Sequence, residues 1–347
     1  MNYSFGSREE FFGFVDSIGP EDRVGILTHT DTDGIASAVF MKDLLESKGV
    51  SLERVWFLDL KIGMYDEFLE DVKGKKLTKL FLTDLSESVD AEGFQKVRKD
   101  FDLFLIDHHP ISANLLSEDF IKTDSGFCAA QIVFDLMDED LKKKWAWLAD
   151  AAIIMDYVFK TPENFEYLQK KYPGILSDDV FASEPGKIGQ KIANSIIYFN
   201  KEKNLEKVYN LLLEKDLKSL AEYSKNVEDV IVKFKKVYRE NAEYFSERDL
   251  YFFYFETTPK FNVLSTAMSL VSNENKDATY ICVAPLGGEE GFLKVSARNQ
   301  NGTQRMNDLL EKGIVGCEGA TAGGHPKASG GSFRKKDFEK FKKNLLS

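Results

Sequence analysis

Short apolar runs alternate with helical stretches through the first third of the sequence, and this alternation restricts the fold more than any other feature. Apolar runs typical of strands occupy residues 23–29, 54–60, 79–85 and 102–107. Segments of helical periodicity, such as residues 35–48, separate them. Strands that alternate with helices of this length form βαβ units, and nearly continuous apolar strands belong to a sheet covered on both faces. The sequence therefore predicts an α/β fold with a Rossmann-like parallel sheet at its N-terminal end.

The rest of the chain changes character twice. Helical periodicity follows the strands, a Pro- and Gly-rich connection occupies residues 172–186, and a turn at residues 287–291 separates two strand-like runs. The length of 347 residues suffices for two domains of ordinary size. We therefore predict an N-terminal domain over residues 1–186, a helical connector over residues 187–245 and a smaller α+β domain over residues 246–347.

The predicted connector carries one apolar face with helical spacing, typical of a helix that buries one side. This face either packs within the chain or forms the seam of a homodimer, and packing is the favoured interpretation. Its members are Val227, Val230, Ile231, Phe234, Val237 and Tyr238.

Composition narrows the class of protein. The net charge of −11 argues against a surface built to grip long duplex DNA. No run approaches the roughly 18–20 apolar residues of a membrane span, and the first residues lack the pattern of a secretory signal. The three cysteines have no metal-type spacing and are expected to be reduced thiols. We therefore expect a cytoplasmic protein with no membrane partner.

All four histidines lie in short polar clusters. His29 begins His-Thr-Asp-Thr-Asp-Gly, His108 and His109 follow Asp107, and His325 lies in Gly-Gly-His-Pro-Lys-Ala-Ser-Gly. No histidine is left for the core, a helix end or an isolated place on the surface. This distribution indicates an enzyme that combines imidazoles with carboxylates to hold divalent metal.

Three of these polar positions coincide with strand ends. His29, Asp84 and Asp107 each fall at the carboxyl end of a predicted strand. Ligand sites of open α/β sheets form in the crevice outside the carboxyl ends of the strands, so we expect these side chains to converge. For any one aspartate, the alternative is an N-cap of the following helix.

The segment from His29 to Gly34 offers one imidazole and two carboxylates. If its backbone is extended, His29, Asp31 and Asp33 point the same way, and Gly34 permits a tight turn into the helix. Imidazole together with carboxylate suits Mn²⁺, Zn²⁺ or Fe²⁺. A calcium loop also contains Asp-x-Asp-Gly, but the late glutamate of an EF-hand is missing here.

Asp107-His108-His109 is the stronger signal. Adjacent histidines after a strand point in different directions, so one can bind metal while the other faces substrate. Asp156 lies in the predicted helix at residues 144–159 amid apolar neighbours, where a carboxylate needs a metal or another partner. A salt bridge or an N-cap is the alternative for Asp156.

These motifs together resemble the DHH phosphoesterase family. The resemblance rests on the His29-x-Asp31-x-Asp33 segment, on Asp84 in Leu-Thr-Asp-Leu, on the Asp107 triplet and on Asp156. It continues with Gly-Gly-His at residues 323–325 and Ser-Gly-Gly at residues 329–331, which are similar to the family's C-terminal, DHHA1-type substrate domain.

The resemblance implies two divalent metal ions, usually Mn²⁺, with Mg²⁺ or Co²⁺ as alternatives, that activate a water for hydrolysis. His109 would contact the scissile phosphate, and Asp107 would orient the metal-binding imidazole from behind, so both count as catalytic. The implied ligands are His29, Asp31 and Asp84 for the first metal and Asp33, Asp84, His108 and Asp156 for the second.

The C-terminal domain would then hold the substrate. Backbone amides near Gly323 and Gly324 can approach a phosphate closely, and His325 can donate to a phosphate oxygen. Arg298 matches the family's position for an arginine that holds phosphate or base. The alternative interpretation of Arg298 is an ordinary surface charge on a hairpin.

We therefore expect a phosphodiesterase that hydrolyses single-stranded or short RNA or DNA to nucleoside monophosphates, similar to nanoRNases or short archaeal RecJ-like exonucleases. One alternative is a small-molecule phosphoesterase for adenosine 3′,5′-bisphosphate or cyclic dinucleotides. Another is a scaffold of weak activity that binds replication or repair proteins. All four histidines are expected to face one cleft between the domains.

Overall fold

The chain divides into two compact units, Met1–Ser224 (unit 1) and Lys225–Ser347 (unit 2). Residues 187–224, which we expected in a connector, form helices that belong to unit 1. The computed structural model describes residues 1–110, 119–123, 126–287 and 290–347.

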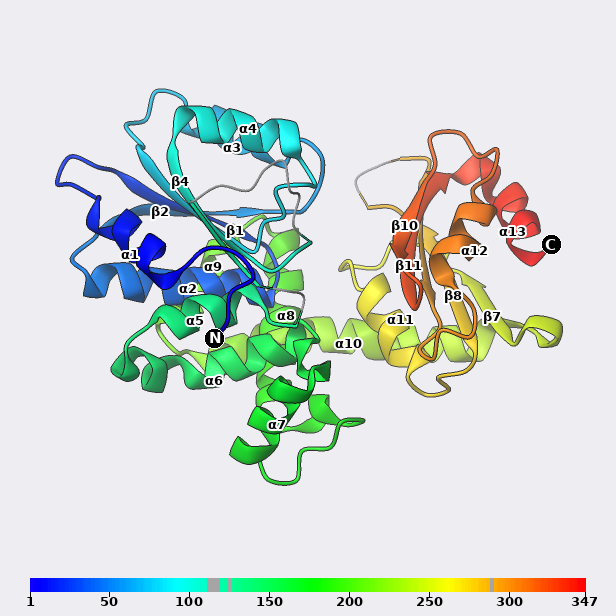
Figure 1. Ribbon diagram of the computed structural model, residues 1–347. Coiled ribbons are helices and arrows are strands. Elements are labelled where there is room, and N and C mark those ends of the chain that lie inside the picture. The colour runs from blue at the N-terminus through cyan, green and yellow to red at the C-terminus, as the bar shows by residue number, and fades with distance from the viewer. Residues whose placement is uncertain (111–118, 124–125, 288–289) are drawn as a thin grey trace. The chain divides into compact units, whose positions relative to one another are not determined.

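A five-stranded parallel sheet forms the centre of unit 1 (Figure 1). Its strand order is β2-β1-β3-β4-β5, so β1 and β3 are neighbours and β4 follows. The predicted parallel sheet is thus confirmed, with a short fifth strand that the sequence pattern did not reveal. The strands are β1 (Val24–His29), β2 (Leu52–Leu58), β3 (Lys79–Thr83), β4 (Asp102–Asp107) and β5 (Phe120–Lys122).

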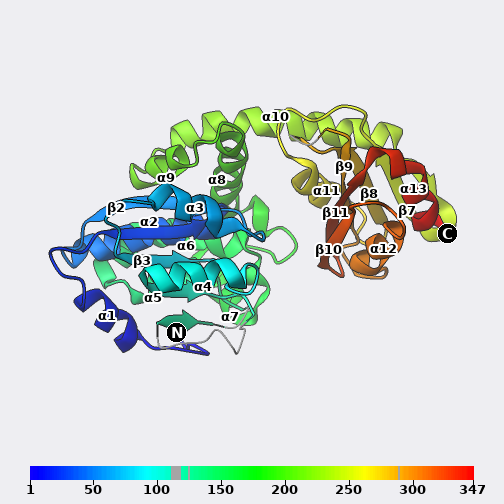
Figure 2. The same cartoon turned by 90° about the horizontal axis from the view of Figure 1, so that it is seen from above.

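Helices cover both faces of this sheet (Figures 1 and 2). The helices α3 and α4 pack on one face, and α1, α2, α5 and α6 pack on the other. Neighbouring strand residues serve opposite faces, as Leu80 and Phe81 do in β3. The helices are α1 (Arg8–Asp16), α2 (Thr32–Ser47), α3 (Met64–Val72), α4 (Ala91–Asp100), α5 (Ala129–Leu136), α6 (Glu139–Met155), α7 (Pro162–Lys171), α8 (Glu184–Lys201) and α9 (Glu206–Leu213).

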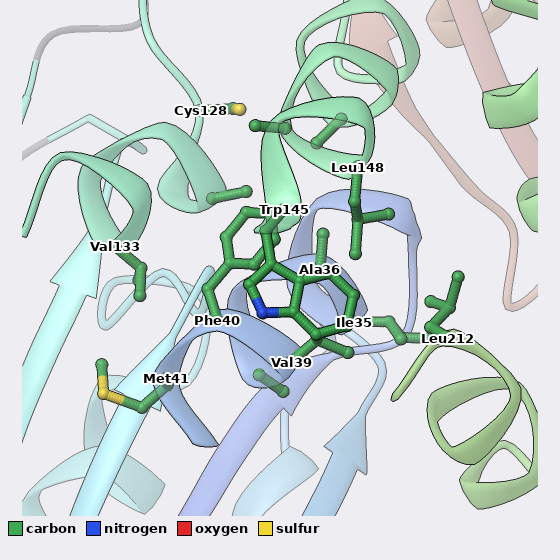
Figure 3. Close-up of a cluster of buried hydrophobic side chains, with 14 of the residues drawn as sticks. Ile35, Ala36, Val39, Phe40, Met41, Cys128, Val133, Trp145, Leu148 and Leu212 are labelled. Carbon is green, nitrogen blue, oxygen red and sulfur yellow. The ribbon is translucent and has the colours of Figure 1, made fainter. Parts of the chain in front are cut away.

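The buried helix α2 anchors the site described below. Its side chains Ile35, Val39 and Phe40 pack against Trp145 of α6, and the Phe40 and Trp145 ring centroids lie 6.2 Å apart (Figure 3). The Trp145 indole also donates to the Asp43 carboxylate at 2.6 Å. Because α2 is held along its length, its first turn has a fixed place at the end of β1.

Unit 2 contains a six-stranded mixed sheet in the order β10-β11-β9-β8-β7-β6. Strands β7 and β8 are parallel, whereas β8 and β9 form the antiparallel pair predicted from the turn between them. Its elements are α10 (Leu217–Asn241), which starts in unit 1, β6 (Glu243–Phe245), β7 (Leu250–Tyr254), α11 (Leu264–Ser272), β8 (Thr279–Pro285), β9 (Phe292–Arg298), α12 (Met306–Gly313), β10 (Thr321–His325), β11 (Ala328–Arg334) and α13 (Phe338–Leu346).

The apolar face expected between residues 227 and 238 lies on α10 and packs within unit 2. Phe234 stacks on Phe255 with ring centroids 4.1 Å apart, and the Tyr238 hydroxyl donates to the carbonyl of Ile281 at 3.2 Å. Val237 is 38% exposed, so the face is covered at most but not all positions. Within the described ranges, no helix is both long and apolar enough to cross a lipid bilayer.

Candidate metal centre

The predicted polar residues of unit 1 meet at the carboxyl edge of its sheet, where β1, β3 and β4 end side by side. Two buried threonines fix this edge. The Thr83 hydroxyl at the end of β3 donates to the Thr28 hydroxyl of β1 at 2.8 Å, and Thr28 donates to the Gly34 carbonyl at 2.6 Å. These bonds tie two strand ends and the first turn of α2 together.

His29 and Asp31 form the first group with Asp84. The His29 Nδ1 atom lies 3.3 Å from a carboxylate oxygen of Asp31 and 3.3 Å from one of Asp84. The expected extended backbone over residues 29–33 is wrong, because α2 begins at Thr32 and Asp31 is its N-cap, accepting from the Gly34 amide at 2.9 Å. A strand end, a cap and a first helical turn bring the side chains together instead.

Gly34 is required for a different reason from the one expected. It lies inside α2, and a Cβ atom at this position would be 2.4 Å from the His29 carbonyl oxygen. Only glycine allows the helix to start so close to the backbone of His29.

Asp33, His108 and Asp156 form the second group. The His108 Nε2 atom lies 3.8 Å from Asp33, and its Nδ1 atom lies 3.8 Å from Asp156. Both oxygens of Asp33 accept backbone amides at the N-terminus of α5, from Ala129 at 2.9 Å and Ala130 at 2.8 Å. Asp156 is the C-cap of α6 rather than a residue inside the helix.

Asp84 stands between the two groups. One of its oxygens lies 3.3 Å from His29, and the other lies 3.3 Å from the His108 Nε2 atom. Asp84 has a positive φ of 57°, a conformation that aspartate and asparagine tolerate better than most residues. In each group the candidate ligand atoms lie within 4.8 Å of one another, so both groups have the spacing of a metal site.

The crowded carboxylates hold both candidate ligand histidines in the protonated form. Burial disfavours the imidazolium of His29, but Asp31 and Asp84 outweigh burial and raise the pKa of His29 to about 11. Burial likewise opposes the charge on His108, whereas the nearby carboxylates, Asp84 first, raise the pKa of His108 to about 10.

The same crowding also raises the pKa values of two of the carboxyls. Burial, followed by repulsion from Asp84, raises the pKa of Asp33 to about 7. Burial and repulsion from Asp33 raise the pKa of Asp156 to about 9. Protons therefore neutralise a set of negative charges that would otherwise be costly to bury.

Divalent metal fits this donor set. Three buried ligand atoms, Asp84 Oδ2, His108 Nδ1 and Asp156 Oδ2, have no hydrogen-bond partner among the described residues. A cation would satisfy these atoms and replace the protons. The mixture of imidazole and carboxylate suits Mn²⁺, Zn²⁺ or Fe²⁺ better than a site made of oxygen alone.

Asp107 binds a different histidine from the one expected. Its carboxylate lies 2.7 Å from the His109 Nδ1 atom and also accepts the His109 amide at 3.3 Å, so it orients His109 and not the candidate ligand His108. The two rings lie 4.7 Å apart, between centroids. Burial opposes the charge on His109, but the Asp107 carboxylate raises the pKa of His109 above its usual range.

A buried lysine that sequence inspection missed completes this arrangement. Lys122, at the end of β5, is fully buried, and its ammonium lies 2.6 Å from Glu87 and 3.3 Å from Asp107. Burial opposes the charge on Asp107, but His109 and Lys122 outweigh burial and lower the pKa of Asp107 to about 2. The sequence feature that could have revealed Lys122 is its position directly after the apolar pair Phe120-Ile121.

In unit 2, the predicted Gly-Gly-His segment forms the end of β10. His325 is exposed, and Gly324 has a φ of 128°. A Cβ atom on Gly324 would lie 2.8 Å from the Ala328 carbonyl oxygen, whereas one on Gly323 would meet nothing within 4 Å. Gly324 is therefore required by the tight turn between β10 and β11.

Arg298 does not present its guanidinium to solvent as the hypothesis of a phosphate-holding residue requires. It is 7% exposed and donates to the hydroxyls of Ser265 and Ser269 on α11 and to the Ser329 carbonyl on β11. These acceptors satisfy the charge inside unit 2. Arg298 therefore links the sheet to α11.

A parallel-sheet unit that collects imidazoles and carboxylates at one edge is followed here by a mixed-sheet unit, as in the phosphoesterase fold of the DHH family. Residues 23–157 match the DHH family, N-terminal domain, and residues 250–347 match the DHHA1 domain. The chain therefore belongs to the DHH family and carries the two domains in the order that the sequence motifs predicted.

Solved structures with the same fold include several DHH proteins. The manganese-bound exonuclease RecJ shares 15% identity at a TM-score of 0.70, covering 99% of this chain and 94% of that one. RecJ of Thermus thermophilus with Mn²⁺ shares 15% sequence identity at a TM-score of 0.67. The match covers 97% of this chain but 53% of that longer chain. An exopolyphosphatase-related protein of Bacteroides fragilis shares 14% sequence identity at a TM-score of 0.59, and the match covers 98% of this chain and 95% of that one. No curated protein sequence matches significantly.

Proposed function

We propose that the chain is a metal-dependent phosphodiesterase that hydrolyses single-stranded or short RNA or DNA to nucleoside monophosphates. The observation that carries the proposal is the position of Asp84 between two groups of imidazole and carboxylate ligands at one sheet edge. Pairs of metal ions in such sites act on phosphodiesters. The likeness to RecJ favours an oligonucleotide substrate within the DHH family.

The proposed division of ligands follows the two groups. Bound metal would polarise the phosphate, activate a water and stabilise the attacking and leaving oxygens. The residues of the chain would position the metal, which would replace the protons now held at the site. His29, Asp31 and Asp84 would hold one ion, and Asp33, Asp84, His108 and Asp156 would hold the other, most consistent with Mn²⁺.

His109 would act on the phosphate rather than on metal. Its Nδ1 atom is engaged by Asp107, so Nε2 is the nitrogen left to face substrate. The Asp107 carboxylate, which outweighs burial, raises the pKa of His109 above its ordinary value and so favours the protonated ring. In that form Nε2 can donate to a phosphate oxygen, and Asp107 keeps the ring in place.

Unit 2 would contribute to substrate binding. Gly323 and Gly324 are exposed and carry no side chain, and the exposed imidazole of His325 can donate to phosphate. Arg298 is proposed to act indirectly, by holding β11, the partner strand of β10, through the Ser329 carbonyl.

One assay tests the proposal. The protein is incubated with Mn²⁺ and, in parallel, with short RNA, short DNA, a long single strand, a cyclic dinucleotide and adenosine 3′,5′-bisphosphate, and the products are separated chromatographically. We expect mononucleotides from the oligonucleotides and no turnover in chelator. Hydrolysis of the bisphosphate or cyclic dinucleotide alone would replace the proposal with a small-molecule phosphoesterase. Inactivity on every substrate would favour a binding scaffold.

A further inference from the structure

An aromatic residue occupies an unusual place directly beside the candidate metal centre. Tyr157 follows Asp156, the C-cap of α6, and adopts a left-handed backbone with a φ of 62°. Its amide donates to the Ile154 carbonyl at 3.2 Å, which ends the helix. Glycine or asparagine usually fills this position, because a larger side chain is sterically disfavoured there. A tyrosine at this point therefore requires a reason.

Two aromatic neighbours pack against the side chain of Tyr157. The Tyr157 ring lies 5.4 Å from the Phe181 ring and 6.1 Å from the Phe159 ring, between centroids. Yet 46% of Tyr157 remains exposed, so much of a large aromatic side chain faces solvent. The Lys160 ammonium lies 4.7 Å from the centre of the same ring, which adds positive charge to the aromatic surface.

We propose that Tyr157 is the stacking surface for a nucleobase of the substrate and that Lys160 attracts the adjoining phosphate backbone. This inference rests on the proposed function. Tyr157 is one residue, about 3.8 Å along the backbone, from a candidate ligand of the metal that would hold the scissile phosphate. An aromatic face paired with a cation suits a nucleotide in a single strand, whose base is unpaired and whose backbone is anionic. Every base has an aromatic face, so binding would be tolerant of sequence.

The test uses trinucleotides in which each base in turn is replaced by hydrogen, so that one position is abasic. With Mn²⁺, the wild-type protein should hydrolyse the intact trinucleotide about tenfold faster, in kcat/KM, than one of the abasic forms. Tyr157→Ala should hydrolyse these two at equal rates, whereas Tyr157→Phe should keep the preference. Tyr244→Ala, which removes an exposed tyrosine of unit 2, is the matched control and should also keep it.

A second pair of variants separates stacking from stability. Glycine accepts the left-handed backbone better than alanine, so Tyr157→Gly should melt about 2–4 °C above Tyr157→Ala. Both lack the ring, so both should lose the preference for the intact base to the same extent. A preference that followed the melting temperature would mean that Tyr157 acts through the fold, and the stacking role would be wrong.

The salt dependence of substrate binding tests the role of Lys160 separately. Lys160→Gln should reduce the slope of log binding constant against log salt concentration by about 0.7 for a short single strand, the value for one phosphate contact. An unchanged slope would remove Lys160 from the substrate site. Equal hydrolysis of intact and abasic trinucleotides by the wild-type protein would overturn the inference and leave the proposed function standing, whereas no hydrolysis of any trinucleotide or longer single strand would overturn both.

Discussion

At the scale of single residues, Asp84 is the carboxylate on which the proposed two-ion arrangement depends, because it lies against both candidate ligand histidines. We predict that Asp84→Asn lowers Mn²⁺ affinity by about 100-fold or more and abolishes hydrolysis. Asparagine also tolerates the positive φ of this position, so the fold should survive. Isothermal titration calorimetry measures the loss.

The control for this substitution is Asp140→Asn, because Asp140 is an exposed carboxylate in the first turn of α6, the helix that ends beside the site. It should bind Mn²⁺ as the wild-type protein does. An Asp84→Asn protein that still bound two ions would contradict the shared position of Asp84.

Lys122 is the residue whose loss should most damage stability. We predict that Lys122→Met costs about 3–5 kcal/mol of unfolding free energy, because it leaves the buried Asp107 carboxylate without its ammonium. Lys73→Met, at a lysine on the surface, should change the free energy by less than about 0.5 kcal/mol. Urea denaturation compares the two. A loss below about 1 kcal/mol would show that Lys122 is not needed to balance the buried acids.

The convergence of His29, Asp84 and Asp107 was predictable from the sequence, because the strand pattern and the carboxyl-edge rule act on single positions. The partner of Asp107 was not predictable in the same way. His108 follows Asp107 directly and His109 lies two residues on, and only side-chain geometry decides that His109 bonds to the Asp107 carboxylate. Arg298 shows the same limit, because its serine acceptors lie on another element, α11.

At the scale of elements, long apolar strands were predictable and short or unusual ones were not. Strands β3 and β4 are continuous apolar runs, whereas β5 has three residues and ends in a lysine. Strand β10 is Thr-Ala-Gly-Gly-His, a composition that does not favour strands and is held by pairing with β11. The start of α2 was misplaced because its polar first turn resembles a loop.

The N-terminal segment should stabilise β5, since the Ser4 amide donates to the Lys122 carbonyl at 2.8 Å. Gly6 and Gly74 both have a φ of 76°, but a Cβ on Gly6 would lie 1.9 Å from the Phe120 carbonyl oxygen, whereas one on Gly74 would meet nothing within 4 Å. We predict that Gly74→Ala costs about 1–2 kcal/mol and that Gly6→Ala costs clearly more. Chemical denaturation measures the two costs in unfolding free energy, and hydrogen exchange of the β5 amides shows how firmly the strand is held. Equal costs would show that the N-terminal segment does not stabilise β5.

At the scale of the whole molecule, the protons held at the site couple its metal binding to stability. Without metal, the pKa values of His29, His108 and Asp156 are about 11, about 10 and about 9. In an unfolded chain, the values are about 6.5 for histidine and about 3.9 for aspartate. The native state thus keeps protons that the unfolded state has released between about pH 6.5 and 9. The stability of the metal-free protein should therefore fall as pH rises through this window.

Mn²⁺ should counteract this fall, because it replaces the protons as the partner of the same ligand atoms. We predict that the melting temperature in chelator declines from about pH 6.5 to about pH 9, and that the stabilisation by a fixed Mn²⁺ concentration grows over the same range. At a concentration 100-fold above its dissociation constant, Mn²⁺ should add about 2.7 kcal/mol. Asp84→Asn should lose the metal increment. An increment in the wild-type protein that did not change with pH would mean that Mn²⁺ binds without displacing protons, and the ligand assignment would have to be abandoned.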